Sequence, residues 1–132
     1  MGNAIWRLQD ARNRSGQRIL AIVQKPGVPF SLTFAHGRLQ LRNSCNFISG
    51  EYLIGEQGAF AIDHLQRSTK HCPNQAEMAA EAEIMSVLEK ATIIELPNGK
   101  AKNRLRIRDA AGRTLSLEAI PLPNSPQNSP KP

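Results

Sequence analysis

Apolar and polar residues alternate over most of this chain, and one long segment departs from that period. Residues 30–34, 38–42 and 104–108 carry an apolar residue at every second position, which is typical of half-buried β-strands. Residues 75–90 instead space their apolar residues as an amphipathic helix does. We therefore expect a sheet packed against a single helix.

Turn signals separate most of the expected strands. Residues 10–18 are polar and predict a loop, and Lys25-Pro26-Gly27 ends the apolar run that precedes it. Short connections favour antiparallel pairing of neighbouring strands. The pattern predicts an α+β, mainly β domain: a curled antiparallel sheet, or partial barrel, with one amphipathic helix packed on it. The expected strands cover residues 5–8, 19–23, 30–34, 38–42, 52–54, 59–62, 92–96, 104–108 and 115–119.

The helix at residues 75–90 has a clear start. Asn74 is a favourable N-cap residue, and Pro73 stops any earlier helix. The apolar side chains are expected on one stripe that faces the sheet, with the methionines as core filler. This stripe consists of Met78, Ala82, Met85 and Leu88, with Ile84 and Val87 beside it.

The length of the chain and the distribution of its prolines set the domain organisation. The chain has 132 residues, which fits one domain. Residues 121–132 contain five of the nine prolines and no apolar pattern. We expect a folded domain over residues 4–120 and a Pro-rich disordered tail over residues 121–132.

The chain is basic, with a formal net charge of +6. Such a charge attracts polyanions such as lipopolysaccharide, phospholipid, acidic proteins or nucleic acid. Two expected strands carry alternating arginines that would project from one side, and these could contact an anionic partner; a solvated face that discourages edge aggregation is the alternative. Nucleic acid is not the expected partner, because aromatic residues are few and no recognition motif is present. The arginines are Arg38 and Arg42 on one strand and Arg104, Arg106 and Arg108 on the other.

No motif for catalysis is visible. The sequence lacks a nucleophile elbow, a Gly-rich phosphate loop and a carboxylate pair. His64, His71 and Cys72 do not show the spacing of a zinc site. We therefore expect no enzymatic activity, no metal and no cofactor.

The start of the chain and its two cysteines bear on the compartment. The segment from Met1 has neither the basic nor the apolar region of a signal peptide, and no apolar run approaches a membrane span. Either a leader was removed or the protein is cytoplasmic. Cys45 and Cys72 could be two buried thiols or could form one disulfide in an oxidising compartment.

Several short motifs occur in an order that resembles the META domain family of HslJ-like heat-shock proteins. Residues 44–50 (SCNFISG) precede a hairpin, and residues 68–73 (STKHCP) precede the acidic helix. Residues 30–39 (FSLTFAHGRL) and residues 109–117 (DAAGRTLSL) are similar to two further family segments, and Trp6 lies where the family has a large apolar residue. The resemblance covers residues 4–119.

The resemblance implies roles for the matching residues. It favours a disulfide between Cys45 and Cys72, and Asn46, Ser49 and Gly50 match the family's structural motif. Phe47 and Ile48 depart from it, because the family usually has an arginine and an aromatic residue there. Ser68 and Thr69 also stand where the family usually has Thr-Arg.

The resemblance further implies a non-enzymatic protein of the bacterial periplasm or cell envelope. Family members are often lipoproteins linked to heat shock and antibiotic tolerance, so we expect binding in stress tolerance or envelope maintenance. The partner would be an anionic lipid or a protein of the envelope, and the chain is expected to be a monomer. The alternatives are a pilot-like carrier that holds an acyl chain in the curled sheet, and a cytoplasmic nucleic-acid-binding domain.

Overall fold

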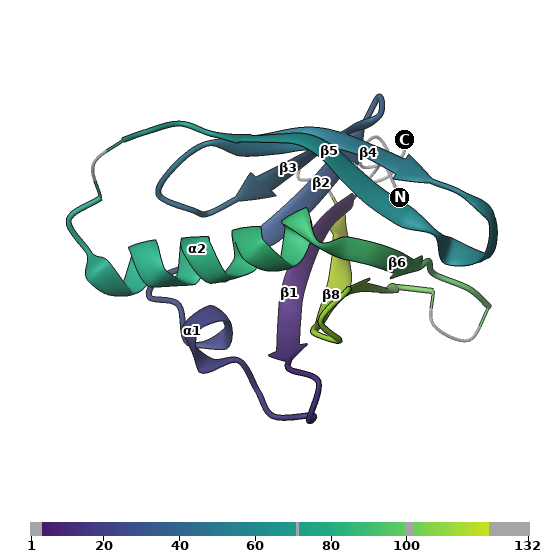
Figure 1. The fold of residues 1–132 in the computed structure, drawn as a ribbon, viewed down its shortest axis with the longest axis horizontal. Helices are drawn as coiled ribbons and strands as arrows, with labels where there is room; N and C mark the ends of the chain where they lie inside the picture. The colour runs from purple at the N-terminus through teal and green to yellow at the C-terminus, as the bar shows by residue number, and fades with distance from the viewer. Residues whose placement is uncertain (1–3, 71, 100–101, 122–132) are drawn as a thin grey trace, which may run out of the picture.

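The fold is one antiparallel sheet that curls around a core and is covered at one end by a helix (Figure 1). The computed structural model describes residues 4–70, 72–99 and 102–121. In order, the elements are β1 (Ala4–Arg12), α1 (Leu20–Val23), β2 (Ser31–Ala35), β3 (Arg38–Arg42), β4 (Ile48–Ile54), the 3₁₀ turn η1 (Glu56–Gly58), β5 (Phe60–Arg67), α2 (Gln75–Glu89), β6 (Ala91–Glu95), β7 (Arg104–Asp109) and β8 (Thr114–Pro121).

The first and last strands lie in the middle of the sheet. Its order is β5-β4-β3-β2-β1-β8-β7-β6, and the β1–β8 register runs from Ala4 opposite Pro121 to Arg12 opposite Thr114. Every neighbouring pair is antiparallel. The predicted fold class, mainly β with a curled antiparallel sheet and one long helix, is confirmed.

The two ends of the sheet meet, so the barrel is nearly closed. A single bridge joins Ala59, just before β5, to Ile93 of β6. Gly58 makes this approach possible: its φ is +80°, and a Cβ there would lie 2.7 Å from the carbonyl oxygen of Ile94. Only a residue without a side chain fits such a position.

Inward side chains of the strands fill the inside of the curled sheet. Alternation along each strand sends one set of residues into the core and the other outward. The largest fully buried side chains are Ile22, Phe30, Leu32, Phe34, Leu39, Ile48, Ile84, Leu88, Ile94, Leu105, Ile107 and Leu115.

Helix α2 begins as predicted but buries a different face. The Asn74 side chain accepts a hydrogen bond from the Glu77 amide at 3.0 Å, which confirms the N-cap. The expected stripe is partly wrong: Met78 is 48% exposed and Ala82 is also exposed. The buried residues of the helix are Ala80, Glu81, Ile84, Val87 and Leu88. The buried face differs from the predicted apolar stripe because it includes Glu81, whose carboxylate is held in the interior by the contacts described below.

Residues 19–23 form a helical turn, so the predicted strand there is wrong. Helix α1 packs against α2 and β1 and buries Ile22. A short, uninterrupted apolar run does not distinguish a strand from a buried helix, because neither period is visible in it. The predicted loop at residues 10–18 begins later than expected, since β1 continues to Arg12.

Strand β8 continues to Pro121, one residue into the predicted tail. Residues 122–132 lie outside the described part of the chain, so the disordered tail stays a prediction. Among the residues that the structure describes, no helix is long and apolar enough to cross a membrane.

Candidate functional site

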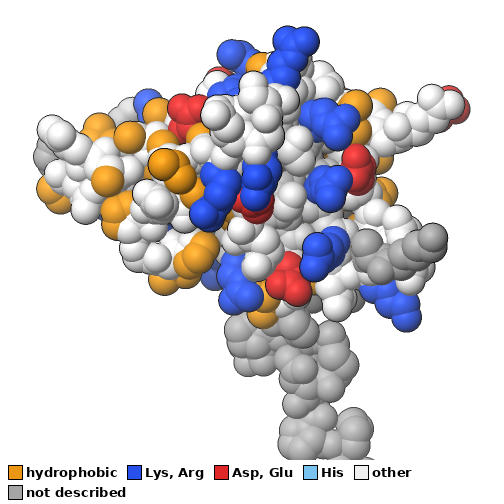
Figure 2. All heavy atoms as spheres, turned by 90° about the horizontal axis from the view of Figure 1, so that it is seen from below, with side chains coloured by type: hydrophobic (Ala, Val, Ile, Leu, Met, Phe, Trp, Pro, Cys, Tyr) orange, Lys and Arg blue, Asp and Glu red, His pale blue; other side chains and the backbone are white. Residues whose placement is uncertain are grey.

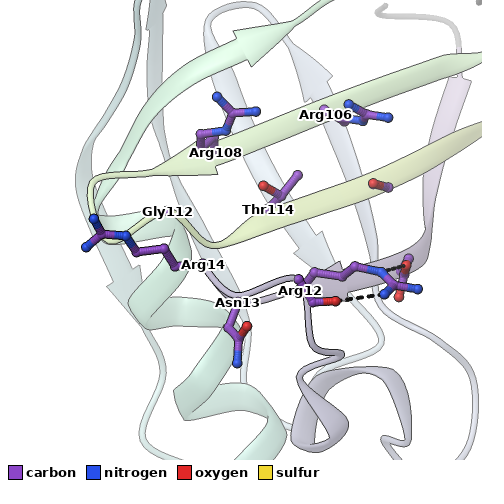
Figure 3. A pocket seen from close by; sticks show the side chains of 10 residues that line it. Arg12, Asn13, Arg14, Arg106, Arg108, Gly112 and Thr114 are labelled. Carbon is purple, nitrogen blue, oxygen red and sulfur yellow. Dashed lines mark hydrogen bonds and ion pairs between the residues drawn. The ribbon is translucent and has the colours of Figure 1, made fainter.

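A basic groove lies on the outer face of β7, β8 and β1. The register places Arg108 opposite Thr114 and Thr114 opposite Arg12, and the next row holds Arg106, Ser116 and Asp10. Strand β8, in the middle, thus contributes the small hydroxyl side chains of Thr114 and Ser116 between longer charged side chains of β1 and β7. We call this cavity of about 550 Å³ the arginine groove; its lining includes Arg12, Arg14, Arg106, Arg108, Thr114 and Ser116 (Figure 3).

A β-bulge turns Arg12 toward this groove. The β1–β8 register shifts between Leu8 and Asp10, so Gln9 is an extra residue in β1. Without the shift, strict alternation from buried Trp6 and Leu8 would send Arg12 into the core. The bulge instead buries Ala11 and points Asp10 and Arg12 outward, as bulges do when they redirect a side chain.

The loop after β1 places Arg14 at the end of the groove. The Asn13 side chain accepts hydrogen bonds from the Ser15 amide at 2.9 Å and the Gln17 amide at 3.0 Å, which fixes the turn. Arg14 then lies against the β7–β8 turn at Gly112 (Figure 3). A Cβ on Gly112 would come within 3.1 Å of Arg14, and the φ of +83° there also favours glycine.

Asp10 is the acidic residue of the groove lining, and it is already engaged. Arg12 Nε donates to Asp10 at 2.6 Å, and Arg18 lies 3.4 Å from the same carboxylate. Partial burial raises the pKa of Asp10, but hydrogen bonds from the Arg12 side chain and the Ala11 amide outweigh this effect. The pKa therefore lies below its ordinary value of 3.8, and Asp10 stays ionised at neutral pH.

The remaining guanidinium groups keep hydrogen-bond donors for a ligand. Arg106 and Arg108 form ion pairs with Glu95 of β6 at 3.7 and 3.9 Å, distances too long for direct hydrogen bonds. Within the described part of the chain, Arg14 has no hydrogen bond or ion pair. Figure 2, which views the molecule from the side on which β1 ends, shows Lys and Arg side chains gathered over this face with acidic side chains between them.

The five arginines predicted as a binding face lie on the outside of the sheet but in two separate places. Strands β2, β1 and β8 lie between β3, which carries Arg38 and Arg42, and β7. Arg104 projects from β7 opposite Glu118, one row away from the groove. Arg106 and Arg108 line the groove itself.

Sequence reasoning missed Arg12 and Arg14. Both belong to the polar segment that was predicted as a loop. The sequence signal that could have found Arg12 is Ala11, an apolar residue between two charged ones that is out of phase with Trp6 and Leu8. The structure buries Ala11, as expected for a strand that has changed its phase.

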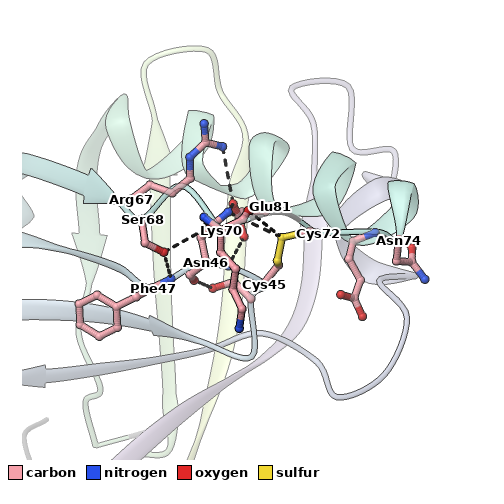
Figure 4. Close-up of a disulfide and its surroundings, with 11 residues drawn as sticks. Cys45, Asn46, Phe47, Arg67, Ser68, Lys70, Cys72, Asn74 and Glu81 are labelled. Atoms are coloured by element: carbon pink, nitrogen blue, oxygen red, sulfur yellow. Dashed lines mark hydrogen bonds and ion pairs between the residues drawn. A yellow bond between two sulfur atoms is a disulfide. The ribbon is translucent and has the colours of Figure 1, made fainter.

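The second feature is a disulfide between Cys45 and Cys72, with a Cα–Cα distance of 6.1 Å (Figure 4). It joins the segment before β4 to the segment before α2, and Asn46 lies next to it. The Asn46 side chain accepts hydrogen bonds from Ser68 Oγ at 3.0 Å and from the Lys70 amide at 2.7 Å. The disulfide and Asn46 thus hold the same two segments together.

Asn46 also holds a buried carboxylate. Its backbone amide donates to Glu81 Oε1 at 2.8 Å, and its side-chain Nδ2 donates to Oε2 at 2.9 Å (Figure 4). The Glu81 side chain is 2% exposed, and Arg67 lies 3.6 Å from it. This network fixes α2 to the disulfide segment. Phe47, where the family pattern differs, is 59% exposed.

The two other motif residues have packing roles. Ser49 Oγ is buried and accepts a hydrogen bond from Arg38 at 3.1 Å. A Cβ on Gly50 would lie 2.9 Å from Ile62 Cγ2 and 3.1 Å from the Asp63 carbonyl oxygen, so the β4–β5 contact there requires glycine.

The histidines and cysteines considered as metal ligands do not come together in the described residues. No group of three or more His, Cys, Asp or Glu side chains that could hold a metal is found among them. His64 lies 3.2 Å from Glu51, and Cys72 is in the disulfide. His71 lies outside the described residues.

Comparisons with known proteins agree on the architecture. A family model described as META domain matches residues 2–120. A protein from Burkholderia xenovorans is similar with a TM-score of 0.69 and 15% identity, over 89% of this chain and 82% of that one. A DUF4847 family protein from Bacteroides vulgatus has a TM-score of 0.62 and 12% identity, over 92% and 95%. A third structure, solved by NMR, has a TM-score of 0.63 and 19% identity, over 94% and 95%. No curated protein matches the chain.

Proposed function

The chain belongs to the META domain family, and from this premise we propose that it is a non-enzymatic protein of the bacterial cell envelope that acts by binding an anionic partner. The arginine groove carries this proposal. Its lining contains four arginines and one aspartate, and that aspartate is neutralised by Arg12 and Arg18. An open groove with such an excess of positive charge attracts anions from solution.

The disulfide supports an envelope location. Disulfides persist in the bacterial periplasm and other oxidising compartments, and they are rare in the reducing cytoplasm. The Cys45–Cys72 bond connects two segments that also share the Asn46 hydrogen bonds, so it belongs to the fold rather than to an exposed reactive site. A role in stress tolerance or envelope maintenance fits a stable periplasmic domain of this kind.

The chemistry of the groove supports binding rather than catalysis. The side chains that could act as nucleophiles, Thr114 and Ser116, have neither a histidine nor a free carboxylate beside them in the groove lining. The Asp10 carboxylate is occupied by hydrogen bonds and its pKa is lowered, which makes it a weak base. A hydroxyl without a base is a poor nucleophile at neutral pH.

The alternative functions have weaker support. An acyl-chain carrier needs an apolar cavity, whereas core side chains such as Phe34 and Leu39 fill the inside of the sheet. Single-stranded nucleic acids are bound by stacking on exposed rings. Of the aromatic side chains, Trp6 and three of the phenylalanines are buried, and Phe47 is the one that is largely exposed.

Binding to vesicles tests this proposal. We expect the protein to bind vesicles that contain phosphatidylglycerol and to release them as salt rises, since salt screens exposed charges. The double variant Arg106→Ser, Arg108→Ser should bind more weakly, and the variant Arg38→Ser, Arg42→Ser, which removes the same number of charges from a distant strand, serves as the control. Binding that is unchanged in the Arg106→Ser, Arg108→Ser variant and insensitive to salt would contradict the proposal. Cell fractionation tests the compartment.

A further inference from the structure

We propose that the arginine groove is a site for a phosphate monoester, the terminal phosphate of a phosphorylated small molecule or lipid headgroup. This inference rests on the proposed function and names the chemistry of its ligand. It depends on the donors that β1, β7, β8 and the loop that carries Arg14 place around one groove, with Arg14 at the end next to Gly112 (Figure 3). Three properties of the groove favour such a ligand: the number of donors, their positions and the charge that they carry.

The donors of the groove outnumber the acceptors of a carboxylate. Arg106 and Arg108 approach from β7, Arg12 and Arg14 approach from the other side, and the hydroxyls of Thr114 and Ser116 lie between them. One guanidinium group can already satisfy both oxygens of a carboxylate in a bidentate pair. A phosphate monoester presents three terminal oxygens, each with several acceptor positions, so it can use more than one guanidinium group and a hydroxyl together.

Part of the groove is held in place before a ligand arrives. Arg12 donates to Asp10 at 2.6 Å and to the Gly16 carbonyl oxygen at 2.8 Å, which fixes its direction. The stem of Arg14 is carried by the Asn13 turn and lies over Gly112, where a Cβ would come within 3.1 Å of Arg14 Cβ and Cγ. A site whose donors are fixed loses less conformational entropy on binding, which favours a small anion over a flexible chain.

The charge of the groove matches a doubly charged group. Four arginines and one aspartate give the lining a formal charge of +3, and Glu95, which lies opposite Arg106 on β6 and pairs with Arg106 and Arg108, lowers the charge of the groove and its rim to +2. A phosphate monoester carries between one and a half and two negative charges near pH 7. A sulfate monoester has the same three terminal oxygens but a single charge, so it separates the effect of charge from that of shape. The volume of about 550 Å³ also leaves room for the group that carries the phosphate.

Isothermal titration calorimetry with glucose 6-phosphate at low salt is the direct test, with glucose 6-sulfate as the matched ligand. We expect the phosphate to bind at least about tenfold more tightly than the sulfate, because a second charge strengthens each charged hydrogen bond. Equal binding of the two sugars, or no binding of the phosphate, would overturn the proposal.

Two single variants and one control localise the site. Arg14→Ser and Arg108→Ser should each weaken glucose 6-phosphate binding about tenfold or more, the loss expected for one hydrogen bond to a charged group. Arg104→Ser removes the same charge from an outward position of the same strand, outside the groove, and should change the affinity less than about twofold. An equal loss in all three variants would show diffuse attraction by net charge and would contradict a built site.

Vesicles of two compositions distinguish the source of the phosphate and separate the two proposals. Phosphatidic acid presents a monoester, whereas phosphatidylglycerol presents a diester. Preferential binding to phosphatidic acid, lost in Arg14→Ser, would identify a lipid headgroup; binding of glucose 6-phosphate without vesicle binding would identify a soluble phosphate compound. Equal binding to both vesicles that is unaffected by Arg14→Ser, with no binding of glucose 6-phosphate, would overturn this inference while leaving the proposed function intact.

Discussion

The buried Glu81 carboxylate makes a sharp prediction, because both of its oxygens must accept hydrogen bonds. Oε1 accepts from the Asn46 amide at 2.8 Å, and Oε2 accepts from Asn46 Nδ2 at 2.9 Å. In Glu81→Gln, the side chain keeps its shape but one oxygen becomes an NH₂ group that faces a donor. The change therefore tests the chemistry of the site without opening a cavity.

The expected cost follows from three effects. A buried donor left without an acceptor costs about 1–3 kcal/mol, and the remaining hydrogen bond weakens by about 1 kcal/mol when its acceptor loses its charge. A neutral amide is cheaper to bury than a carboxylate, which offsets part of this loss. We expect Glu81→Gln to lower the free energy of unfolding by about 2 kcal/mol.

Urea unfolding followed by tryptophan fluorescence measures this change. The chain has one tryptophan, Trp6, and it is 2% exposed, so its emission reports directly on the core. Glu89→Gln is the matched control, because Glu89 is an exposed residue at the end of the same helix. If Glu81→Gln changed the free energy of unfolding by less than about 0.5 kcal/mol, the spread typical of surface substitutions, the proposed dependence on two acceptors would be refuted.

Three further perturbations have expected outcomes. Replacing Cys45 and Cys72 by serine should lower the free energy of unfolding by about 3.5 kcal/mol, because the disulfide closes a loop with a sequence separation of 27. Alkylation with and without reductant first checks that the bond is present, and free thiols before reduction would contradict it. Gly58→Ala should lower the melting temperature more than Gly16→Ala, since both have positive φ but only the first meets a carbonyl oxygen, at 2.7 Å; equal losses would mean that the seam tolerates a side chain. The stabilisation from ionised Asp10 is fully present above its unfolded-state pKa of 3.8 and is lost as pH falls through its lower folded-state value. Asp10→Asn should therefore reduce the loss of unfolding free energy that urea titrations measure as the pH is lowered, and the same loss in the variant as in the original protein would contradict this.

The regular part of the fold could be predicted because alternation and helical period are local signals. The hairpin of β2 and β3 and the strands β7 and β8 follow the apolar pattern directly, and Asn74 marks the start of α2. The face of α2 could not be found in this way. Glu81 is a charged residue, and its burial depends on Asn46, which is 35 positions away in the sequence.

The candidate site was only half visible in the sequence for a related reason. Arg106 and Arg108 alternate with buried residues, so their outward direction was clear. Arg12 faces the same groove because a single extra residue, Gln9, changes the phase of β1. A bulge leaves little trace in a short alternating pattern, and β8, the strand against which this bulge forms, comes from the other end of the folded domain.

The pairing of Ala4 with Pro121 has a consequence for how this domain can be tethered. Both ends of the domain leave from the same point, whereas Arg12 lies at the other end of β1, eight residues further along and therefore about 26 Å away. Figure 1 shows β1 running from this pole of the sheet to the opposite one, so a segment joined at either end would hold the molecule at the pole far from Arg12. In a tethered protein, the Arg12 end of the groove would therefore lie far from the surface that holds the domain. A lipid headgroup of that same surface could bind there only after the domain had changed its orientation.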